Sequence, residues 1–190
     1  MKHAAAILGV LVFLSACTSN PTPSTTDSSK IVSDSSLTRP IQSPFDITYS
    51  SKFAMDEPTN AESVLKFWKA YDNGDFSTVK NLFADSFEVH LADGMSMHTS
   101  RDSTLADVTM FRNSLTASSS TVTAVMAVKS TDRNEHWVLI WGTEKDTHKD
   151  GKIDSVDLHE AWQFNKNGQA MMLLQYKRSY APPAAMKKKK

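Results

Sequence analysis

The sequence predicts an α+β domain over about residues 53–181, because helix-period and strand-period stretches are grouped along the chain. The apolar residues recur at helical spacing in about residues 59–83 and 103–115, and after Ser118 they alternate with polar residues. Turn-forming pairs such as Asp150-Gly151 separate the alternating stretches. Grouped helices followed by strands with short connections are typical of an α+β fold with a mostly antiparallel sheet.

Three helices are expected in the first half of this domain. The first opens at Thr59, which has capping-box spacing to Glu62, and Asn73-Gly74 stops it. A shorter helix begins at Asp75, and a third covers about residues 103–115. The residues expected to face inward are Val64, Leu65, Phe67, Trp68 and Tyr71 on the first, Phe76, Val79, Leu82 and Phe83 on the second, and Leu105, Val108, Phe111 and Leu115 on the third.

Six strands are expected. Two short ones, at residues 86–91 and 95–99, are separated by Asp93-Gly94. Four long ones follow at residues 121–129, 136–145, 155–164 and 170–178, and "NKNG" makes the last turn. Their short connections predict an antiparallel meander.

The N-terminus predicts a lipoprotein signal peptide at residues 1–16. Lys2 and His3 precede an apolar run that ends at Leu14, which is too short to span a bilayer. "LSAC" at residues 14–17 resembles the lipobox of bacterial lipoproteins. That resemblance implies cleavage before Cys17, acylation of its thiol and new amino group, and attachment to membrane lipid. The alternative is an ordinary signal peptide with a chance cysteine.

The segments beside the domain are expected to be disordered. Residues 17–52 are rich in Ser, Thr and Pro and predict a tether below acylated Cys17, and residues 182–190 form a basic tail. Cys17 is the only cysteine, which excludes an intramolecular disulfide and thiolate chemistry in the domain. The formal net charge is zero, so nothing points to nucleic acid.

The stretch "DTHKDGKIDSVD", residues 146–157, partly follows the pattern of an EF-hand calcium loop. However, both flanks alternate like strands, whereas an EF-hand needs helices. His148 stands at a ligand position where a hard cation prefers an oxygen atom. Asp157 stands at the last ligand position, where the geometry requires the longer, bidentate side chain of Glu. We therefore interpret residues 146–157 as the tip of a long hairpin and predict neither a metal site nor a cofactor site.

The element order and two sequence stretches resemble the nuclear transport factor 2-like superfamily, which includes SnoaL-like polyketide cyclases and ketosteroid isomerase. The stretches are "FWKAYDNGDFSTVKNLFADSFEVHLADG" (67–94) and "HEAWQFNKNG" (159–168). The resemblance covers about residues 59–180. It implies a cone, in which a curved, mostly antiparallel sheet wraps around the helices and leaves an apolar pocket, often in a homodimer.

The resemblance does not extend to the catalytic residues of ketosteroid isomerase. Superposing the Gly-Asp of residues 74–75 and the Phe-Ala-Asp of residues 83–85 places Phe67 at the oxyanion-hole tyrosine and Leu91 at the general-base aspartate. A phenylalanine cannot donate that hydrogen bond and a leucine cannot move a proton. A slip of one residue would bring His90 to the base position, which keeps an acid/base enzyme open.

Four polar residues are candidates for the pocket. His159 has Asp157 on the same strand face, so the two could form an acid/base pair, or they could face solvent or a second subunit. His90 could line the mouth of the cone or lie at the sheet edge. Glu160 alternates with apolar residues, so either it points into the pocket as a functional carboxylate or that face of the strand is not the core. The candidate pocket side chains besides these are Phe67, Trp68, Tyr71, Trp162 and Tyr176.

Three functions remain open from the sequence. The missing isomerase residues favour a membrane-tethered lipoprotein whose cone binds a small hydrophobic ligand or a partner without catalysis. The first alternative is a SnoaL-like isomerase, hydratase or hydrolase that acts on a small hydrophobic substrate. The second is a structural or assembly lipoprotein of the cell envelope. In each case we expect a lipid anchor in a bacterial envelope, with Thr18 after Cys17 resembling proteins sorted to an outer membrane.

Overall fold

The computed structural model describes residues 41–179, which belong to one compact unit. Cys17, the signal peptide, most of the predicted tether and the basic tail lie outside the described residues. The elements are β1 (Phe53–Met55), α1 (Thr59–Asn73), the 3-10 turn η2 (Lys80–Leu82), β2 (Phe83–His90), β3 (Ser96–Ser100), α2 (Arg101–Ser114), β4 (Leu115–Ser130), β5 (Glu135–His148), β6 (Ile153–Phe164) and β7 (Ala170–Ser179). The predicted α+β class is confirmed.

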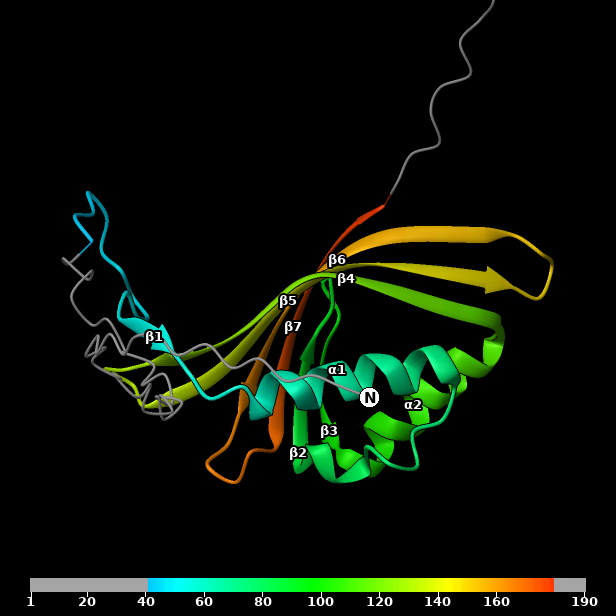
Figure 1. Cartoon of the computed structure of the whole chain (residues 1–190), viewed down its shortest axis with the longest axis horizontal. Coiled ribbons are helices and arrows are strands. Elements are labelled where there is room, and N and C mark those ends of the chain that lie inside the picture. Colours follow the sequence, from blue (N-terminus) through cyan, green and yellow to red (C-terminus); the bar gives the residue numbers. More distant parts are fainter. Residues whose placement is uncertain (1–40, 180–190) are drawn as a thin grey trace, which may run out of the picture. The chain divides into compact units, whose positions relative to one another are not determined.

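All seven strands form one sheet in the order β1-β4-β5-β6-β7-β2-β3. Every neighbouring pair is antiparallel except β2 and β7, which are parallel. The predicted meander of four long strands is confirmed as β4 to β7. The sheet bends strongly, and α1 and α2 lie on its concave side (Figure 1). This arrangement agrees with the predicted cone.

Helix α1 ends as predicted but does not begin as predicted. Gly74 adopts the left-handed conformation at φ 70°, and its N–H bonds back to the last turn. Pro58 precedes the first helical residue, and no side chain caps the N-terminus, so the Thr59–Glu62 capping box is wrong. Thr59 instead becomes part of the first turn, where its carbonyl accepts a hydrogen bond from Ser63.

The second predicted helix is wrong, so α1 and α2 are the two α-helices of the described domain. Residues 75–76 are irregular, residues 77–79 form a turn, and Lys80–Leu82 make a single 3-10 turn before β2. The Asp75 carboxylate accepts a hydrogen bond from Ser77 N at 2.9 Å, which offers the backbone a local partner in place of a helical one. Phe76 and Val79 still point inward and pack with Tyr71.

Helix α2 is tied to α1 by a buried arginine. Ser100 caps its N-terminus by accepting a hydrogen bond from Ser103 N at 3.2 Å. Near its other end, Arg112 donates to the carbonyls of Tyr71 and Asp72 at 2.7 and 2.8 Å. These carbonyls belong to the last turn of α1, at the negative end of the helix dipole, so a cation is favourable there. Strand β4 begins directly afterwards at Leu115, earlier than the predicted residue 121.

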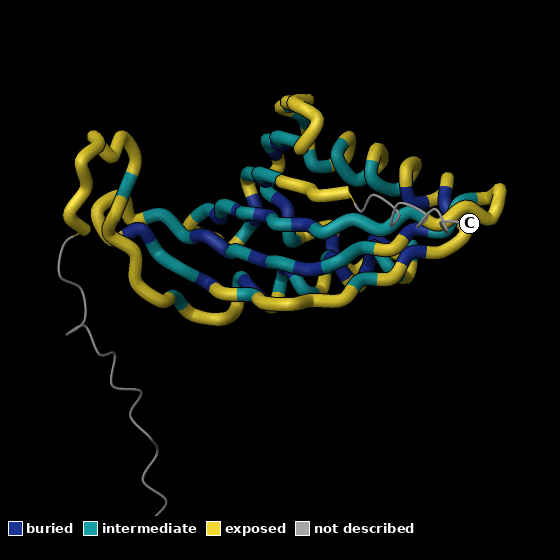
Figure 2. Tube along the Cα trace, turned by 90° about the horizontal axis from the view of Figure 1, so that it is seen from above, coloured by how far each residue is buried: buried dark blue, intermediate teal, exposed yellow. Residues whose placement is uncertain are grey.

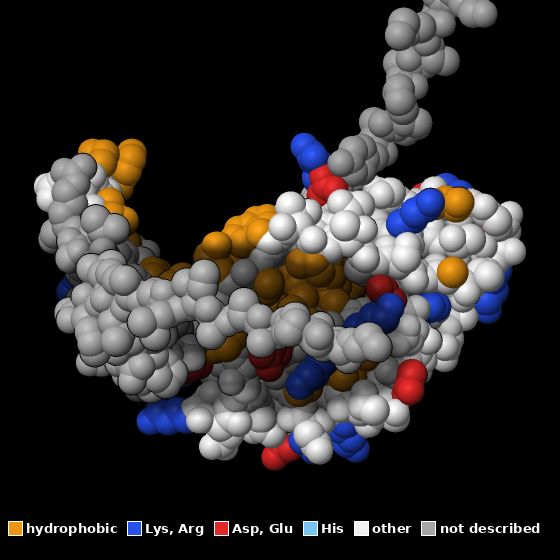
Figure 3. Space-filling view, viewed as in Figure 1, with side chains coloured by type: hydrophobic (Ala, Val, Ile, Leu, Met, Phe, Trp, Pro, Cys, Tyr) orange, Lys and Arg blue, Asp and Glu red, His pale blue; other side chains and the backbone are white. Residues whose placement is uncertain are grey.

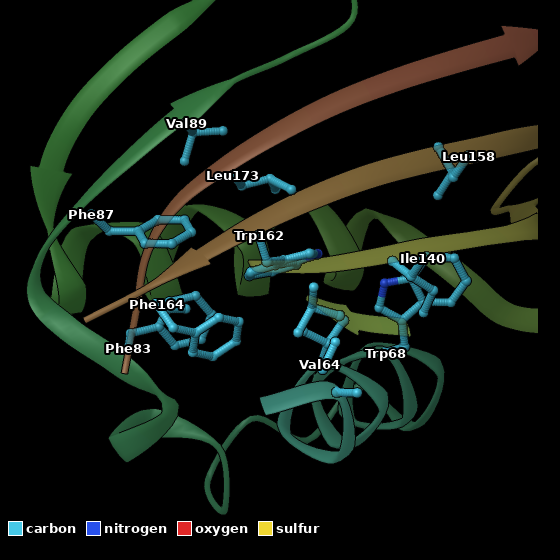
Figure 4. Close-up of a cluster of buried hydrophobic side chains, with 14 residues drawn as sticks. Val64, Trp68, Phe83, Phe87, Val89, Ile140, Leu158, Trp162, Phe164 and Leu173 are labelled. Atoms are coloured by element: carbon cyan, nitrogen blue, oxygen red, sulfur yellow. The ribbon is translucent and has the colours of Figure 1, made fainter. Parts of the chain in front are cut away.

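The core lies between α1 and the middle of the sheet. Phe83, Phe87, Ile140, Val64 and Trp162 are at most 2% exposed. Figure 4 shows these side chains converging from α1, β2, β5 and β6, and Figure 2 shows the buried residues gathered along the middle strands.

A glycine allows the sheet and α1 to approach closely at the edge of this core. A Cβ at Gly142 would lie 2.5 Å from Thr121 O and 2.7 Å from Cζ3 of Trp68. Both distances are shorter than van der Waals contact, so the indole of Trp68 packs directly on the backbone of β5.

Contacts to the sheet begin before the predicted domain boundary at residue 53. Tyr49 donates a hydrogen bond to the Glu135 carboxylate and packs edge-on against Trp137. Ser50 donates to Asp132 at 2.7 Å. Residues 49–52 therefore belong with the sheet rather than with the predicted tether. Neither helix among residues 41–179 has the length and apolarity needed to cross a bilayer.

Candidate functional site

A cavity of about 550 Å³ lies between the concave face of the sheet and the two helices. Figure 3 shows hydrophobic side chains in a hollow on this side, with acidic and basic side chains near its edge. The volume falls within the usual range for small-molecule sites, about 300–1,000 Å³. The centre of the cone is therefore open, although it contains two tryptophans.

The wall of the cavity is mainly apolar, with aromatic and aliphatic side chains in about equal share. Phe67 joins several of the aromatic side chains, with its ring centroid 5.3 Å from that of Phe83 and 5.4 Å from that of Trp162. The aromatic lining residues are Phe67, Trp68, Tyr71, Phe83, Phe87, Phe111 and Trp162, and the aliphatic ones include Val89, Leu91, Val108, Val156, Leu158 and Leu173. Such a wall offers a large apolar contact area to a ligand.

Glu160 is a carboxylate at the bottom of this wall and is 4% exposed. Its Oε2 accepts hydrogen bonds from Nε1 of Trp68 at 2.8 Å and of Trp162 at 3.0 Å. Its Oε1 accepts one from the Gln175 amide at 2.9 Å. Burial raises the pKa of Glu160, while these three donors oppose the rise. All of its hydrogen bonds are therefore made within the protein.

Glu144 and Asp146 form a second acidic group, on the concave face of β5. They are two residues apart, so both side chains point to the cavity that they line. Burial, followed by the charges of Asp146 and Glu160, raises the pKa of Glu144 to about 8. At neutral pH Glu144 is therefore mostly protonated, and in that form it can donate a hydrogen bond to Asp146.

The hairpin between β5 and β6 lies at the far end of this acidic group. His148 Nε2 lies 2.8 Å from the Asp154 carboxylate, and both residues line the cavity. Gly151 has φ 82°, and the Asp150 carboxylate accepts a hydrogen bond from Lys152 N, which closes the turn. The predicted hairpin is confirmed. No group of three or more metal-ligating side chains occurs among residues 41–179.

Comparisons with known proteins extend to structure only, since no family profile and no curated protein match the sequence. AusH from Aspergillus nidulans matches with a TM-score of 0.52 at 14% identity, over 67% of this chain and 88% of that chain. A protein described as a SnoaL-like polyketide cyclase from Shewanella denitrificans OS-217 matches with a TM-score of 0.53 at 11% identity, over 64% of this chain and 92% of its own.

A nuclear transport factor 2-like protein of unknown function from Exiguobacterium sp. 255-15 gives a TM-score of 0.50 at 15% identity, over 61% of this chain and 98% of that one. The chain has the nuclear transport factor 2-like fold. At such identities the likeness is one of fold, so the function rests on the side chains of this domain.

Within the nuclear transport factor 2-like domain, His159 and Asp157 do not line the cavity. Strand β6 places Glu160 on the concave face and its neighbours on the other face. There His159 stacks on Trp141 with ring centroids 4.6 Å apart, and its Nε2 is buried without a hydrogen-bond partner among residues 41–179. Asp157 accepts a hydrogen bond from Thr143. Of the two alternatives for His159 and Asp157, the acid/base pair inside the pocket is therefore wrong.

His90 and Tyr176 also lie away from the cavity. His90 bonds to Glu88 and Ser96 at 2.8 and 2.9 Å, because Leu91, its neighbour, takes the inward position. A one-residue slip that would put His90 in the pocket does not occur. Tyr176 is 59% exposed and lies beside His159 on the convex face.

Of the residues proposed for the pocket from the sequence, five line the cavity: Phe67, Trp68, Tyr71, Glu160 and Trp162. Glu144 and Asp146 were missed. A signal for Glu144 was available, because it continues the alternation of Val138 and Ile140, which are fully buried on β5. Strand β5 continues beyond its predicted end at residue 145, because it pairs with β6 as far as Thr147↔Ile153. Asp146 therefore also lies within the alternating strand.

The convex face of the sheet carries exposed or half-buried apolar side chains, among them Met126, Trp141, Leu174 and Tyr176. A homodimer packed through this sheet face stays a prediction.

Proposed function

We propose that this domain binds a small, mainly apolar molecule in its cavity without changing it chemically, and that acylated Cys17 holds the domain at a bacterial envelope membrane, on the outer membrane if the cell has one. The observation that carries the binding proposal is the open aromatic cavity on the concave face of the sheet. The two positions that the isomerase resemblance assigns to a tyrosine and a base, Phe67 and Leu91, are apolar lining residues.

Binding of the neutral dye Nile red tests the cavity. We expect its fluorescence to rise with the purified protein, and Val108→Trp to weaken its affinity about tenfold or more, because the larger side chain fills the space that Val108 lines. Met110→Trp is the matched control, because Met110 lies on the same helix but is 70% exposed. An equal effect of both substitutions, or no dye binding at all, would contradict a ligand cavity.

The tether proposal rests on the lipobox at residues 14–17 and on the polar segment after it. We expect the bacterial protein to fractionate with membranes and to carry a mass increase from acyl chains at Cys17. Cys17→Ser should remove both, because the serine hydroxyl does not replace the acylated thiol. A wild-type protein that is soluble and unmodified would contradict the anchor.

The second candidate is a SnoaL-like acid/base enzyme, and Glu144 is the observation that favours it. A carboxyl with a pKa of about 8 inside an apolar cavity can give and take protons near neutral pH. The SnoaL-like cyclase neighbour shares the fold that would surround such a group. If the protein is such an enzyme, it converts a small hydrophobic substrate and Glu144→Gln abolishes that conversion. If it is a binding protein, the ligand is recovered unchanged.

A further inference from the structure

The charges around the cavity are strongly unbalanced. Six carboxyl groups line it, with one lysine and one histidine: Asp93, Asp107, Glu144, Asp146, Asp154 and Glu160 against Lys177 and His148. His148 is already paired with Asp154, and Lys177 lies in the exposed half of β7. Carboxylates in a low-dielectric wall interact strongly with any charge brought beside them. An anionic ligand would therefore be repelled, and a cationic one attracted.

Asp146 points to a missing partner. It is 9% exposed, and its Oδ1 is buried with no hydrogen-bond donor among residues 41–179. Glu144 can supply a donor only by keeping its own proton, which burial and the neighbouring carboxylates favour. A buried carboxylate oxygen without a partner destabilises the protein, because it has lost its hydration and gained nothing in return. This cost is removed if a cation from outside the protein occupies the cavity.

Aromatic rings surround the space next to the acidic pair. Tyr71 lies close enough to Glu144 and Asp146 for their charges to raise its pKa further, after the larger effect of burial. Phe67 and Trp162 continue the wall toward the core. The faces of such rings attract ammonium groups electrostatically. Carboxylate and aromatic side chains together suit a cation that also has apolar substituents.

We propose that the ligand of this cavity is an organic cation, with an ammonium group at Glu144 and Asp146 and an apolar body among Phe67, Phe87 and Trp162. The proposal rests on the ligand-binding function proposed above and specifies its ligand class. A neutral apolar molecule fills the same wall but leaves Asp146 with no partner except the proton that Glu144 holds. Glu160 does not take part directly, because its three hydrogen bonds are satisfied by the protein.

The cation takes the place of the proton that Glu144 holds in the free protein. Binding near neutral pH should therefore release a proton, which calorimetry in two buffers of different ionisation enthalpy measures. The charged or titratable groups near Glu144 on the surrounding elements are Asp146 and His148 on β5, Asp72 and Tyr71 on α1, Arg112 on α2, Asp154 and Glu160 on β6, and Lys177 on β7.

A pair of shape-matched probes tests the ligand class. Benzyltrimethylammonium and neopentylbenzene differ in one central atom, which is a charged nitrogen in the first and a neutral carbon in the second. Each is added to the purified protein loaded with Nile red, and displacement of the dye gives its dissociation constant. We expect the cation to bind about tenfold or more tightly than the neutral probe.

Substitutions locate the effect. Asp146→Asn and Glu144→Gln should each weaken benzyltrimethylammonium binding about tenfold, while neopentylbenzene and Nile red change by about twofold or less. Glu57→Gln is the matched control, because Glu57 is exposed and outside the cavity. Retained Nile red binding shows that each variant is folded.

The outcomes separate this inference from the function beneath it. If Nile red binds but the neutral probe displaces it as well as the cation does, the cation proposal is wrong and the apolar cavity stands. The cation proposal is also wrong if benzyltrimethylammonium binds more tightly than neopentylbenzene but Asp146→Asn and Glu144→Gln leave its affinity unchanged. If Nile red does not bind the wild-type protein, the proposed function itself fails.

Discussion

Replacing Glu160 by leucine is expected to lower the free energy of unfolding by about 3–5 kcal/mol. The substitution removes the acceptor of two buried indole N–H groups, those of Trp68 and Trp162, and of the Gln175 amide. Each donor left without a partner costs about 1–3 kcal/mol, which exceeds the gain from burying an apolar side chain in place of a carboxylate. Urea denaturation followed by circular dichroism measures the change.

Glu160→Gln is the matched variant for this prediction. Its amide oxygen can still accept both indole hydrogen bonds, and no charge has to be buried. We expect it to lie within about 1.5 kcal/mol of the wild type. If the leucine variant were as stable as the glutamine variant, the hydrogen bonds to Glu160 would not hold α1 against the sheet.

The second large effect is a pH dependence of stability that comes from Glu144. Its pKa is about 8 in the folded protein, above the ordinary value of 4.5 that applies to the unfolded chain. As pH rises from about 4.5, the unfolded chain loses this proton first, so the free energy of unfolding falls until about pH 8. Each pKa unit corresponds to about 1.4 kcal/mol, and partial exposure of Glu144 reduces this contribution. We therefore expect the free energy of unfolding to fall by about 2–4 kcal/mol.

Glu144→Gln isolates this contribution because the amide does not titrate. Urea denaturation at pH 4.5, 6, 7.5 and 9 should show the variant gaining on the wild type by about 2–4 kcal/mol across the series. Glu57→Gln, with an exposed carboxyl, serves as control. A constant difference between wild type and Glu144→Gln at every pH would mean that folding does not raise the pKa of Glu144.

Short-range pattern was a good guide wherever one face of an element is buried. The period of two in residues 136–164 predicted β5, β6 and their hairpin, because a half-buried strand must alternate. The same alternation correctly placed Glu160 inside. It could not separate a helix from a run of turns at residues 75–83, because Phe76, Val79 and Phe83 are buried in both. The structure has a turn there, in which the Asp75 carboxylate accepts a hydrogen bond from Ser77 N.

The candidate site was less predictable than the fold. His159 and Asp157 were candidates because a histidine and a carboxylate can act as an acid/base pair. However, alternation along β6 puts both on the convex face, opposite to Glu160. Glu144 and Asp146 looked like ordinary polar residues near a hairpin. Only the bend of the sheet, which brings that end of β5 over α1, turns them into cavity residues with a raised pKa at Glu144.

The residue order was sufficient for the α+β class, the meander of long strands and the faces of β5 and β6, because these follow from local periodicity and turn chemistry. The open cavity and its acidic group depend on curvature, on the close approach of Trp68 to the backbone at Gly142, and on which carboxyls lose their water. Those are properties of segments distant in sequence, since desolvation is set by everything that packs around a group.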